Sequence, residues 1–187
     1  MPVVDPREAR SAGAPLLNAL IACGAVRFGE FTLASGAKSD YYVDIKRAST
    51  DPSVLRLIGE GFARHVGSAK RIAGMELGAV PLAAAASLAS GVPFLMVRKK
   101  PKGYGTASQI EGVFEPGMEV VVVEDVTTSG GSSVEAVKVL RAAGLTVTKV
   151  VTVVDRESGA AKAFADIDVP FFALTTASEL LKTRGSA

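Results

Sequence analysis

The sequence predicts an α/β fold with a central, mostly parallel sheet and helices on both of its faces. Residues 120–123 and 150–154 consist entirely of β-branched side chains. Such continuous runs are typical of strands that are buried on both faces. Helical segments alternate with short apolar strands from Arg71 onward, which is the pattern of parallel strands joined by helical crossovers. In such a sheet a ligand binds beyond the carboxyl ends of the strands, so the residues that follow each strand are the candidate functional residues.

The N-terminal part precedes this alternating pattern. Its leucines recur at helical spacing, which predicts a helix over residues 6–24. Two short strands are expected over residues 28–33 and 41–45, separated by a Ser-Gly turn.

The later elements follow in a regular order. Asp51 and Pro52 are typical of a helix start, because Asp caps the first N–H groups and Pro suits the first turn. The expected elements after this helix are strand 71–74, helix 81–90, strand 94–97, strand 119–123, helix 132–143, strand 146–154, helix 158–165, strand 171–174 and helix 177–183.

Length and composition limit the classes of protein to consider. At 187 residues, the whole chain, 1–187, is expected to form one domain. Hydrophobic residues make up 48% and charged residues 21% of the chain, a balance that argues against disorder. The net charge of +2 gives no reason to expect nucleic acid as a partner.

Cysteine and histidine are scarce, and this excludes several kinds of chemistry. The chain has one of each, Cys23 and His65. These cannot form an intrachain disulfide or a structural zinc site, and thiol or imidazole catalysis could use only these two residues. The chemistry must therefore rely on carboxylates, lysine, arginine, hydroxyls and backbone amides.

Residues 77–97 contain no charged side chain and are long enough in principle to cross a bilayer. Pro81, Gly91 and Pro93 interrupt this segment, however, so a buried helix followed by a strand is the better interpretation. The N-terminus also lacks the basic-then-apolar order of a secretory signal. We therefore expect a cytoplasmic protein with no membrane partner.

The most informative motif follows the strand over 119–123. It begins with an acidic pair, Glu124 and Asp125, which can accept hydrogen bonds from adjacent sugar hydroxyls. A small, hydroxyl-rich segment over 128–132 then opens a helix, and its N–H groups and hydroxyls would converge on an anion such as a phosphate. The order of residues is neither that of a P-loop nor that of a dinucleotide site. A capped strand–turn–helix junction is the alternative, but it gives no reason for two adjacent carboxylates.

A basic loop, residues 98–106, follows the strand over 94–97. Four cations lie within residues 98–102, and nearby glycines and a proline disfavour regular structure. Such a loop could neutralise a pyrophosphate leaving group and close over a site to exclude water. A solvated loop or a general polyanion-binding patch is the alternative.

Residues 120–132 resemble the phosphoribosyl-pyrophosphate (PRPP) motif of type I phosphoribosyltransferases. The basic loop resembles the catalytic loop of the orotate phosphoribosyltransferase family, and the resemblance as a whole covers about residues 28–160. It implies the type I phosphoribosyltransferase fold, in which about residues 1–50 form an N-terminal helix and a small hood. It also implies a pentosyltransferase that makes orotidine 5′-monophosphate and pyrophosphate from orotate and PRPP, in pyrimidine (UMP) biosynthesis.

The resemblance further implies how PRPP is bound. The acidic pair would bind the ribose hydroxyls, the following loop the 5′-phosphate, and the basic loop and a short glycine-containing loop before Pro81 the pyrophosphate. The implied PRPP-binding residues are Leu77, Gly78, Arg98, Lys99, Lys102, Tyr104, Glu124, Asp125, Val126, Thr127, Thr128, Ser129, Gly130, Gly131 and Ser132. Lys102, as a mobile cation, and Asp125 are assigned to catalysis. Many relatives have Lys at the position of Ala34 and His at the position of Tyr104.

Arg156, which directly follows the strand over 146–154 and Asp155, is implied to bind orotate together with Thr128. An arginine is suited to two parallel hydrogen bonds with a carboxylate. Tyr41 and Tyr42 resemble the paired aromatics of the family's orotate pocket. From the residues alone, Arg156 could equally pair with a neighbouring carboxylate at the surface, and the tyrosines could belong to an ordinary half-buried strand.

Mg²⁺ is implied to be bound by PRPP oxygens, because no dedicated carboxylate cage is visible in the sequence. The resemblance also implies a homodimer in which the loop over 98–106 reaches the neighbouring subunit's site. Three other possibilities stay open. They are a purine or xanthine phosphoribosyltransferase, whose substrate has no carboxylate for Arg156, a non-catalytic PRPP-sensing regulator, and a structural Rossmann-like domain with accidental motifs.

Overall fold

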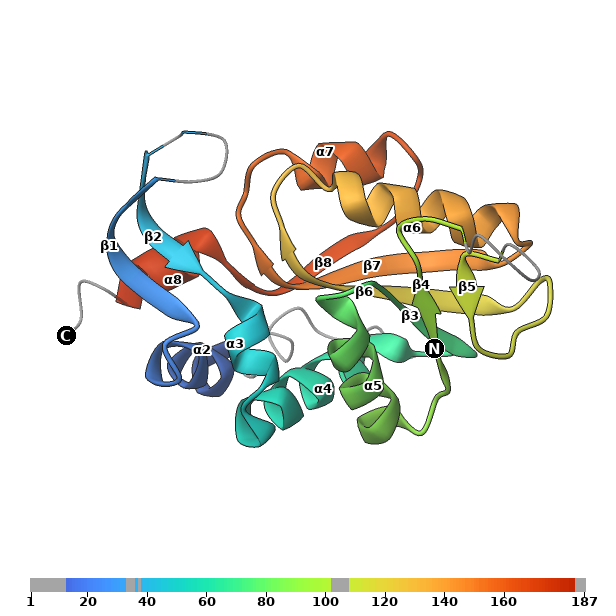
Figure 1. Cartoon of the computed structure of the whole chain (residues 1–187), viewed down its shortest axis with the longest axis horizontal. Coiled ribbons are helices and arrows are strands. Elements are labelled where there is room, and N and C mark those ends of the chain that lie inside the picture. The colour runs from blue at the N-terminus through green and yellow to red at the C-terminus, as the bar shows by residue number, and fades with distance from the viewer. Residues whose placement is uncertain (1–12, 33–35, 37, 102–107, 184–187) are drawn as a thin grey trace.

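The computed structural model describes residues 13–32, 36, 38–101 and 108–183, and a six-stranded sheet forms its centre (Figure 1). The strands are β3 (Arg71–Met75), β4 (Phe94–Val97), β5 (Ile110–Glu111), β6 (Glu119–Thr127), β7 (Thr146–Asp155) and β8 (Phe171–Thr176). Their order across the sheet is β5-β4-β3-β6-β7-β8, and every neighbouring pair is parallel except β4 with β5. The predicted α/β class with a mostly parallel sheet is confirmed.

Helices cover both faces of this sheet. α4 (Pro52–Val66) and α5 (Ala79–Ser90) lie on one face, and α6 (Gly131–Ala142) and α7 (Ala160–Ala165) lie on the other (Figure 1). Val121 and Val123 of β6 belong to the apolar cluster of α4 and α5, whereas Val120 and Val122 belong to that of α6 and α7. Because successive side chains of a strand face opposite sides, a strand between two helical layers needs an apolar residue at every position.

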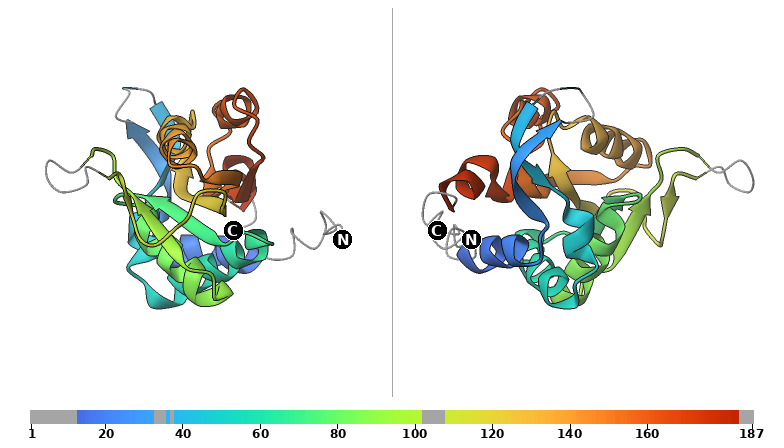
Figure 2. Two further views of the ribbon diagram at one scale, coloured as in Figure 1. Left: turned by 90° about the vertical axis from the view of Figure 1, so that its right-hand side faces the viewer. Right: turned by 60° about the vertical axis from the view of Figure 1, so that its left-hand side comes forward.

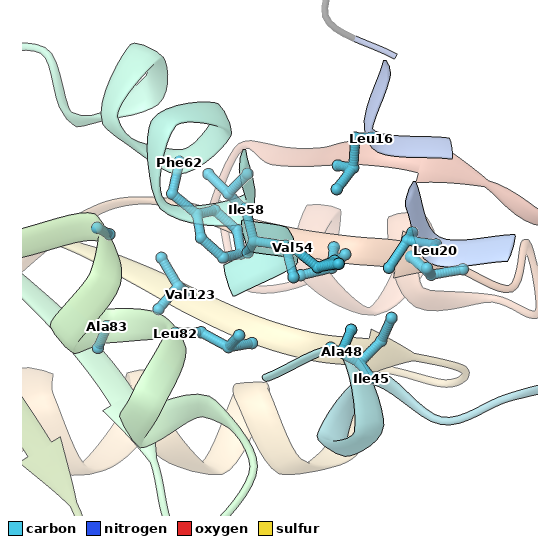
Figure 3. Packing of buried hydrophobic residues seen from close by; sticks show 14 of the residues in the cluster. Leu16, Leu20, Ile45, Ala48, Val54, Ile58, Phe62, Leu82, Ala83 and Val123 are labelled. Carbon is cyan, nitrogen blue, oxygen red and sulfur yellow. The ribbon is translucent and has the colours of Figure 1, made fainter. Parts of the chain in front are cut away.

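The larger apolar cluster also contains the N-terminal helix, α2 (Gly13–Ala22). Phe62 and Ile58 of α4 pack in this cluster with Val123 of the sheet (Figure 3). Leu16 and Leu20 of α2 are buried in the same cluster. The N-terminal helix therefore shares its core with the central sheet.

An antiparallel hairpin stands apart from the central sheet. It consists of β1 (Val26–Thr32) and β2 (Lys38–Val43), and the short helix α3 (Ile45–Ser49) follows it. Figure 2 shows the hairpin rising beside the edge at which β6 and β7 end. This is where a hood over a site at that edge would stand, and the division of the chain into one domain with such a hood stays a prediction.

Several element boundaries differ from the prediction. Ile45 begins α3 rather than ending a strand, and its side chain is buried in the core. β6 continues to Thr127, so the acidic pair lies within the strand rather than beyond it. α7 begins later than expected, after Gly159, whose φ of 104° is a conformation that favours glycine. The two-residue strand β5 is too short to leave a pattern in the sequence.

Residues 77–97 do not form a single long element. They contain α5 and β4 with a break between them, as the prolines and the glycine predict. In the part of the chain that the structure describes, no helix has the length and apolar character needed to span a bilayer. The last described element, α8 (Ala177–Thr183), has the bounds expected from the sequence.

Candidate active site

The predicted functional segments meet at the carboxyl edge of the sheet. Gly74 pairs with Val123 across β3 and β6, and Thr127 pairs with Asp155 across β6 and β7. The segments that follow β3, β6 and β7 therefore leave the sheet on the same side. Strands that lie side by side and run parallel place their end loops together, as expected for a ligand site in this class of fold.

Glu124 is the most deeply buried acidic group at this edge. Its side chain is only 8% exposed, and its Oε2 accepts a hydrogen bond of 2.8 Å from the hydroxyl of Ser133 in α6. Its Oε1 accepts a bond of 3.0 Å from the backbone N–H of Asp125. Burial, and secondly the negative charge of Asp125, raise the pKa of Glu124 to about 7. Near neutral pH the protonated form of Glu124 is therefore populated far more than that of an ordinary glutamate.

Asp125 lies against the short loop that follows β3. A Cβ atom at position 78 would collide with the Asp125 carboxylate, so any other residue here would have to displace that carboxylate. The other carboxylate oxygen of Asp125 accepts a bond of 2.7 Å from the N–H of Val126. The structure thus brings together Gly78 and Asp125, which the sequence assigned to the pyrophosphate and ribose parts of one ligand.

The loop between β6 and α6 presents an open helix N-terminus. Gly130 precedes α6 with a φ of 84°, and no side chain at this position caps the helix. Thr128, Ser129 and Ser132 are exposed, and the space beside Gly131 is open to 4 Å. Free N–H groups and hydroxyls at a helix N-terminus form a ready anion site.

Val126 and Thr127 differ from the rest of this predicted phosphate loop. The Val126 side chain is partly buried and packs against the apolar core. The Thr127 side chain is buried, and its Oγ1 has no hydrogen-bond partner among the described residues. Its carbonyl oxygen accepts a bond of 2.9 Å from the N–H of Arg156.

The start of the basic loop is anchored at the same edge. The guanidinium of Arg98 lies 3.7 Å from the carboxylate of Glu111. The N–H of Lys99 donates to Glu76 with a length of 2.8 Å, which connects this loop to the one carrying Leu77 and Gly78. The Leu77 side chain is exposed. Lys102 and Tyr104 lie outside the described residues.

Arg156 joins the edge of the sheet to the hairpin. Its Nε donates to the Tyr41 hydroxyl at 3.2 Å, and its guanidinium carbon lies 5.0 Å from the centre of the Tyr41 ring. A second guanidinium nitrogen donates to the Ser39 hydroxyl at 3.5 Å. The sequence left open whether Arg156 serves the base pocket or pairs with a neighbouring carboxylate at the surface. The structure favours the first, because the guanidinium contacts Tyr41 and Ser39 of the hairpin.

Tyr41 and Tyr42 do not share a face of β2. Tyr41 is buried against Arg156, whereas the Tyr42 ring lies 5.6 Å from that of Phe31 and 5.2 Å from the guanidinium carbon of Arg27. Neighbouring residues of a strand point to opposite sides. The structure therefore brings Tyr41, but not Tyr42, to the predicted orotate arginine.

A hollow of about 630 Å³ adjoins these contacts, lined by Glu30, Lys38, Ser39, Asp40 and Tyr41. Ser39 was not among the site residues expected from the sequence, although residues two positions apart on a strand share a face and Ser39 lies two positions before Tyr41. Ser133, the partner of Glu124, was not among them either. No local signal identifies Ser133, because the contact depends on how α6 folds back beside β6.

We predict that Glu124 makes the stability of the protein depend on pH. In the folded protein the Glu124 carboxyl keeps its proton up to a pH of about 7, whereas in the unfolded chain it loses the proton near its ordinary pKa of 4.5. The free energy of unfolding should therefore fall as pH rises from about 4.5 to 7, by about 3 kcal/mol at most. Glu124→Gln should flatten this fall, as measured by urea unfolding at several pH values. Equal slopes in the two proteins would contradict the burial of an acid at this position.

Comparison with known proteins shows which family the chain belongs to. Residues 54–171, more than half of the chain, match the model of the phosphoribosyl transferase domain family. The orotate phosphoribosyltransferase of Methanosarcina acetivorans is 53% identical over 169 residues, which cover 89% of this chain and 90% of that protein.

Solved structures agree as well. The orotate phosphoribosyltransferase of Aeropyrum pernix has a TM-score of 0.80 at 34% identity, and the match covers 92% of this chain and 99% of that one. The Mycobacterium tuberculosis enzyme, solved in complex with PRPP, has a TM-score of 0.76 at 32% identity, with 90% of this chain and 98% of that one covered. Sequence, fold and site geometry thus point the same way, and the chain belongs to the orotate phosphoribosyltransferase family.

Proposed function

We propose that this protein transfers the phosphoribosyl group of PRPP to orotate, giving orotidine 5′-monophosphate and pyrophosphate in pyrimidine biosynthesis. The observation that carries the proposal is the position of Arg156. It lies at the carboxyl edge of the sheet, where its backbone N–H contacts the strand of the acidic pair and its guanidinium contacts Tyr41 of the hairpin. A base with a carboxylate group matches this arginine, whereas purine bases carry none.

The ribose and its 5′-phosphate account for the acidic pair in β6 and for the open N-terminus of α6. Glu124 and Asp125 would accept hydrogen bonds from the ribose hydroxyls. The backbone N–H groups and hydroxyls of residues 128–132 would bind the 5′-phosphate at the N-terminus of α6. Val126 and Thr127 would contribute mainly through their backbone, because the Val126 side chain packs against the apolar core and that of Thr127 is buried.

The pyrophosphate end of PRPP lies, in this proposal, toward the loop after β3 and the basic loop. Leu77 and Gly78 offer backbone groups there, and Arg98, Lys99, Lys102 and Tyr104 would supply positive charge or hydrogen bonds. As pyrophosphate leaves, positive charge develops at the sugar carbon C1 and negative charge on the leaving group. The protein would lower the barrier mainly by position and by charge, without a covalent intermediate.

Orotate would occupy the space between Arg156, Thr128 and the hairpin. Its carboxylate could replace the Tyr41 and Ser39 hydroxyls as partners of the guanidinium, with a gain from two charge-assisted bonds. The Tyr41 ring would then form one wall of the pocket. Tyr42 stays a predicted contact for which the geometry offers no support, because it packs on the other face of β2.

Mg²⁺ fits this site as a companion of PRPP. Among the described residues, no group of three or more His, Cys, Asp and Glu side chains is arranged to hold a metal ion. The oxygens of PRPP would supply its ligands, since Mg²⁺ prefers oxygen ligands and usually keeps several of its waters. When bound, the ion would neutralise charge on the leaving pyrophosphate. The homodimer, the reach of residues 98–106 into a neighbouring subunit and the cytoplasmic location stay predictions.

The direct test is an activity panel with PRPP and Mg²⁺. Orotate, xanthine, hypoxanthine, guanine and adenine are offered separately, while pyrophosphate release and the ultraviolet absorbance of the base are followed. Turnover with orotate alone is expected. Turnover only with a purine base would overturn the choice of base, and PRPP binding without turnover of any base would indicate a PRPP-sensing regulator instead.

Lys102 provides a second test of the proposed chemistry. Replacing it by alanine removes the cation assigned to the leaving pyrophosphate, so kcat should fall by about tenfold or more while the protein stays folded. Lys100→Ala is the matched control, because it removes a charge from the same loop at a position with no assigned contact. Near-normal turnover of Lys102→Ala, or an equal loss in both variants, would remove Lys102 from its proposed role.

A further inference from the structure

The segment after β7 is attached to the C-terminal helix by Glu157. One carboxylate oxygen, Oε2, accepts two hydrogen bonds from Ser178 of α8, one of 2.7 Å from the backbone N–H and one of 2.6 Å from the hydroxyl. The first N–H groups of a helix have no partner within the helix, so this carboxylate satisfies one of them. Glu157 and Ser178 are 21 positions apart in the sequence, and the contact therefore crosses from one element to another.

The backbone around Glu157 is held in an unusual conformation. Glu157 has a φ of 54°, in the left-handed region that side chains other than glycine seldom adopt. On the other side of Arg156, a carboxylate oxygen of Asp155 accepts a bond of 2.9 Å from the N–H of Glu157. A conformation of this kind persists only where surrounding contacts enforce it, and these bonds supply the enforcement.

Arg156 lies between these two anchors. Its N–H donates to the carbonyl oxygen of Thr127 at 2.9 Å, and its carbonyl oxygen accepts a bond of 3.0 Å from the hydroxyl of Ser158. The side chain must leave the end of β7 in the direction of Tyr41 and Ser39 to make its observed contacts. The backbone turn that sets this direction ends at Glu157.

We propose that Glu157 is a positioning residue for the base, which aims Arg156 at the orotate carboxylate by clamping the loop after β7 onto α8. The inference rests on the proposed function, because it takes orotate to be the ligand that Arg156 binds. Glu157 itself does not contact the substrate in this proposal, because both hydrogen bonds of its side chain are made to Ser178. The effect is therefore expected on the affinity for orotate rather than on that for PRPP.

The chemistry of the clamp allows a sharp set of variants. Both donors converge on one oxygen, so the amide oxygen of a glutamine can accept both bonds without the charge. Alanine accepts neither bond, and aspartate is one methylene too short to reach. Glycine also loses both bonds, but it adopts the left-handed backbone conformation without steric cost. Comparing Glu157→Gly with Glu157→Ala therefore distinguishes the loss of the two hydrogen bonds from the effect of backbone strain.

The test is the steady-state kinetics of the full-length protein with orotate and PRPP varied in turn. Glu157→Ala, Glu157→Asp and Glu157→Gly should each raise the KM for orotate about tenfold, with kcat and the KM for PRPP within about twofold of the unchanged protein. Glu157→Gln should restore the KM for orotate to within about twofold. Ser178→Ala, which keeps the backbone donor, should have a smaller effect.

Two outcomes would overturn the positioning role. One is an unchanged KM for orotate in Glu157→Ala and Glu157→Gly. The other is a parallel change for orotate and PRPP, which would indicate general damage to the fold. These outcomes are distinct from failure of the proposed function, because that failure shows in the unchanged protein as absence of turnover with orotate. Hydrogen exchange at the Ser178 amide, faster in Glu157→Ala, reports the clamp independently of activity, and equal exchange rates would also overturn it.

Discussion

The site depends above all on the burial of Glu124 beside Asp125 at the end of β6. Two adjacent carboxylates in a strand repel each other, and burying one of them raises its pKa to about 7. The arrangement is sustained by Ser133, which donates to Glu124, and by Gly78, which leaves room for Asp125. Burying such an acidic pair destabilises the fold, and a purely structural strand gains nothing from it. The hydroxyl groups of a ribose would offset this cost by donating hydrogen bonds to both carboxylates.

The second half of the site is built by contacts between distant segments. Arg156 follows β7, yet its partners Tyr41 and Ser39 lie on the hairpin, and the adjacent Glu157 is held by α8. The proposed ribose and phosphate positions therefore depend on β6 and α6, while the proposed base position depends on how the hairpin and α8 pack around the edge of the sheet. This division fits a family in which a common PRPP site is combined with a pocket for a particular base.

The sequence predicted the sheet well, because a strand between two helical layers must be apolar throughout, as residues 120–123 are. It also predicted the segments at the carboxyl edge, since each follows such a strand. It could not predict whether Tyr41 or Tyr42 faces Arg156, because the two adjacent residues are identical and only the register of the hairpin decides. The contacts of Glu124 with Ser133, and of Glu157 with Ser178, depend on tertiary packing and leave no pattern along the chain.

We expect the ribose hydroxyls to donate to the buried Glu124 and so to displace the proton that its raised pKa lets it hold near neutral pH. Calorimetric titration of the protein with PRPP and Mg²⁺ at pH 7, in buffers of different ionisation enthalpy, measures the protons released on binding. Because burial raises the pKa of Glu124 to about 7, the unchanged protein should release more protons on binding PRPP at this pH than Glu124→Gln does. Equal proton release by the two proteins, with PRPP bound to both, would contradict the account.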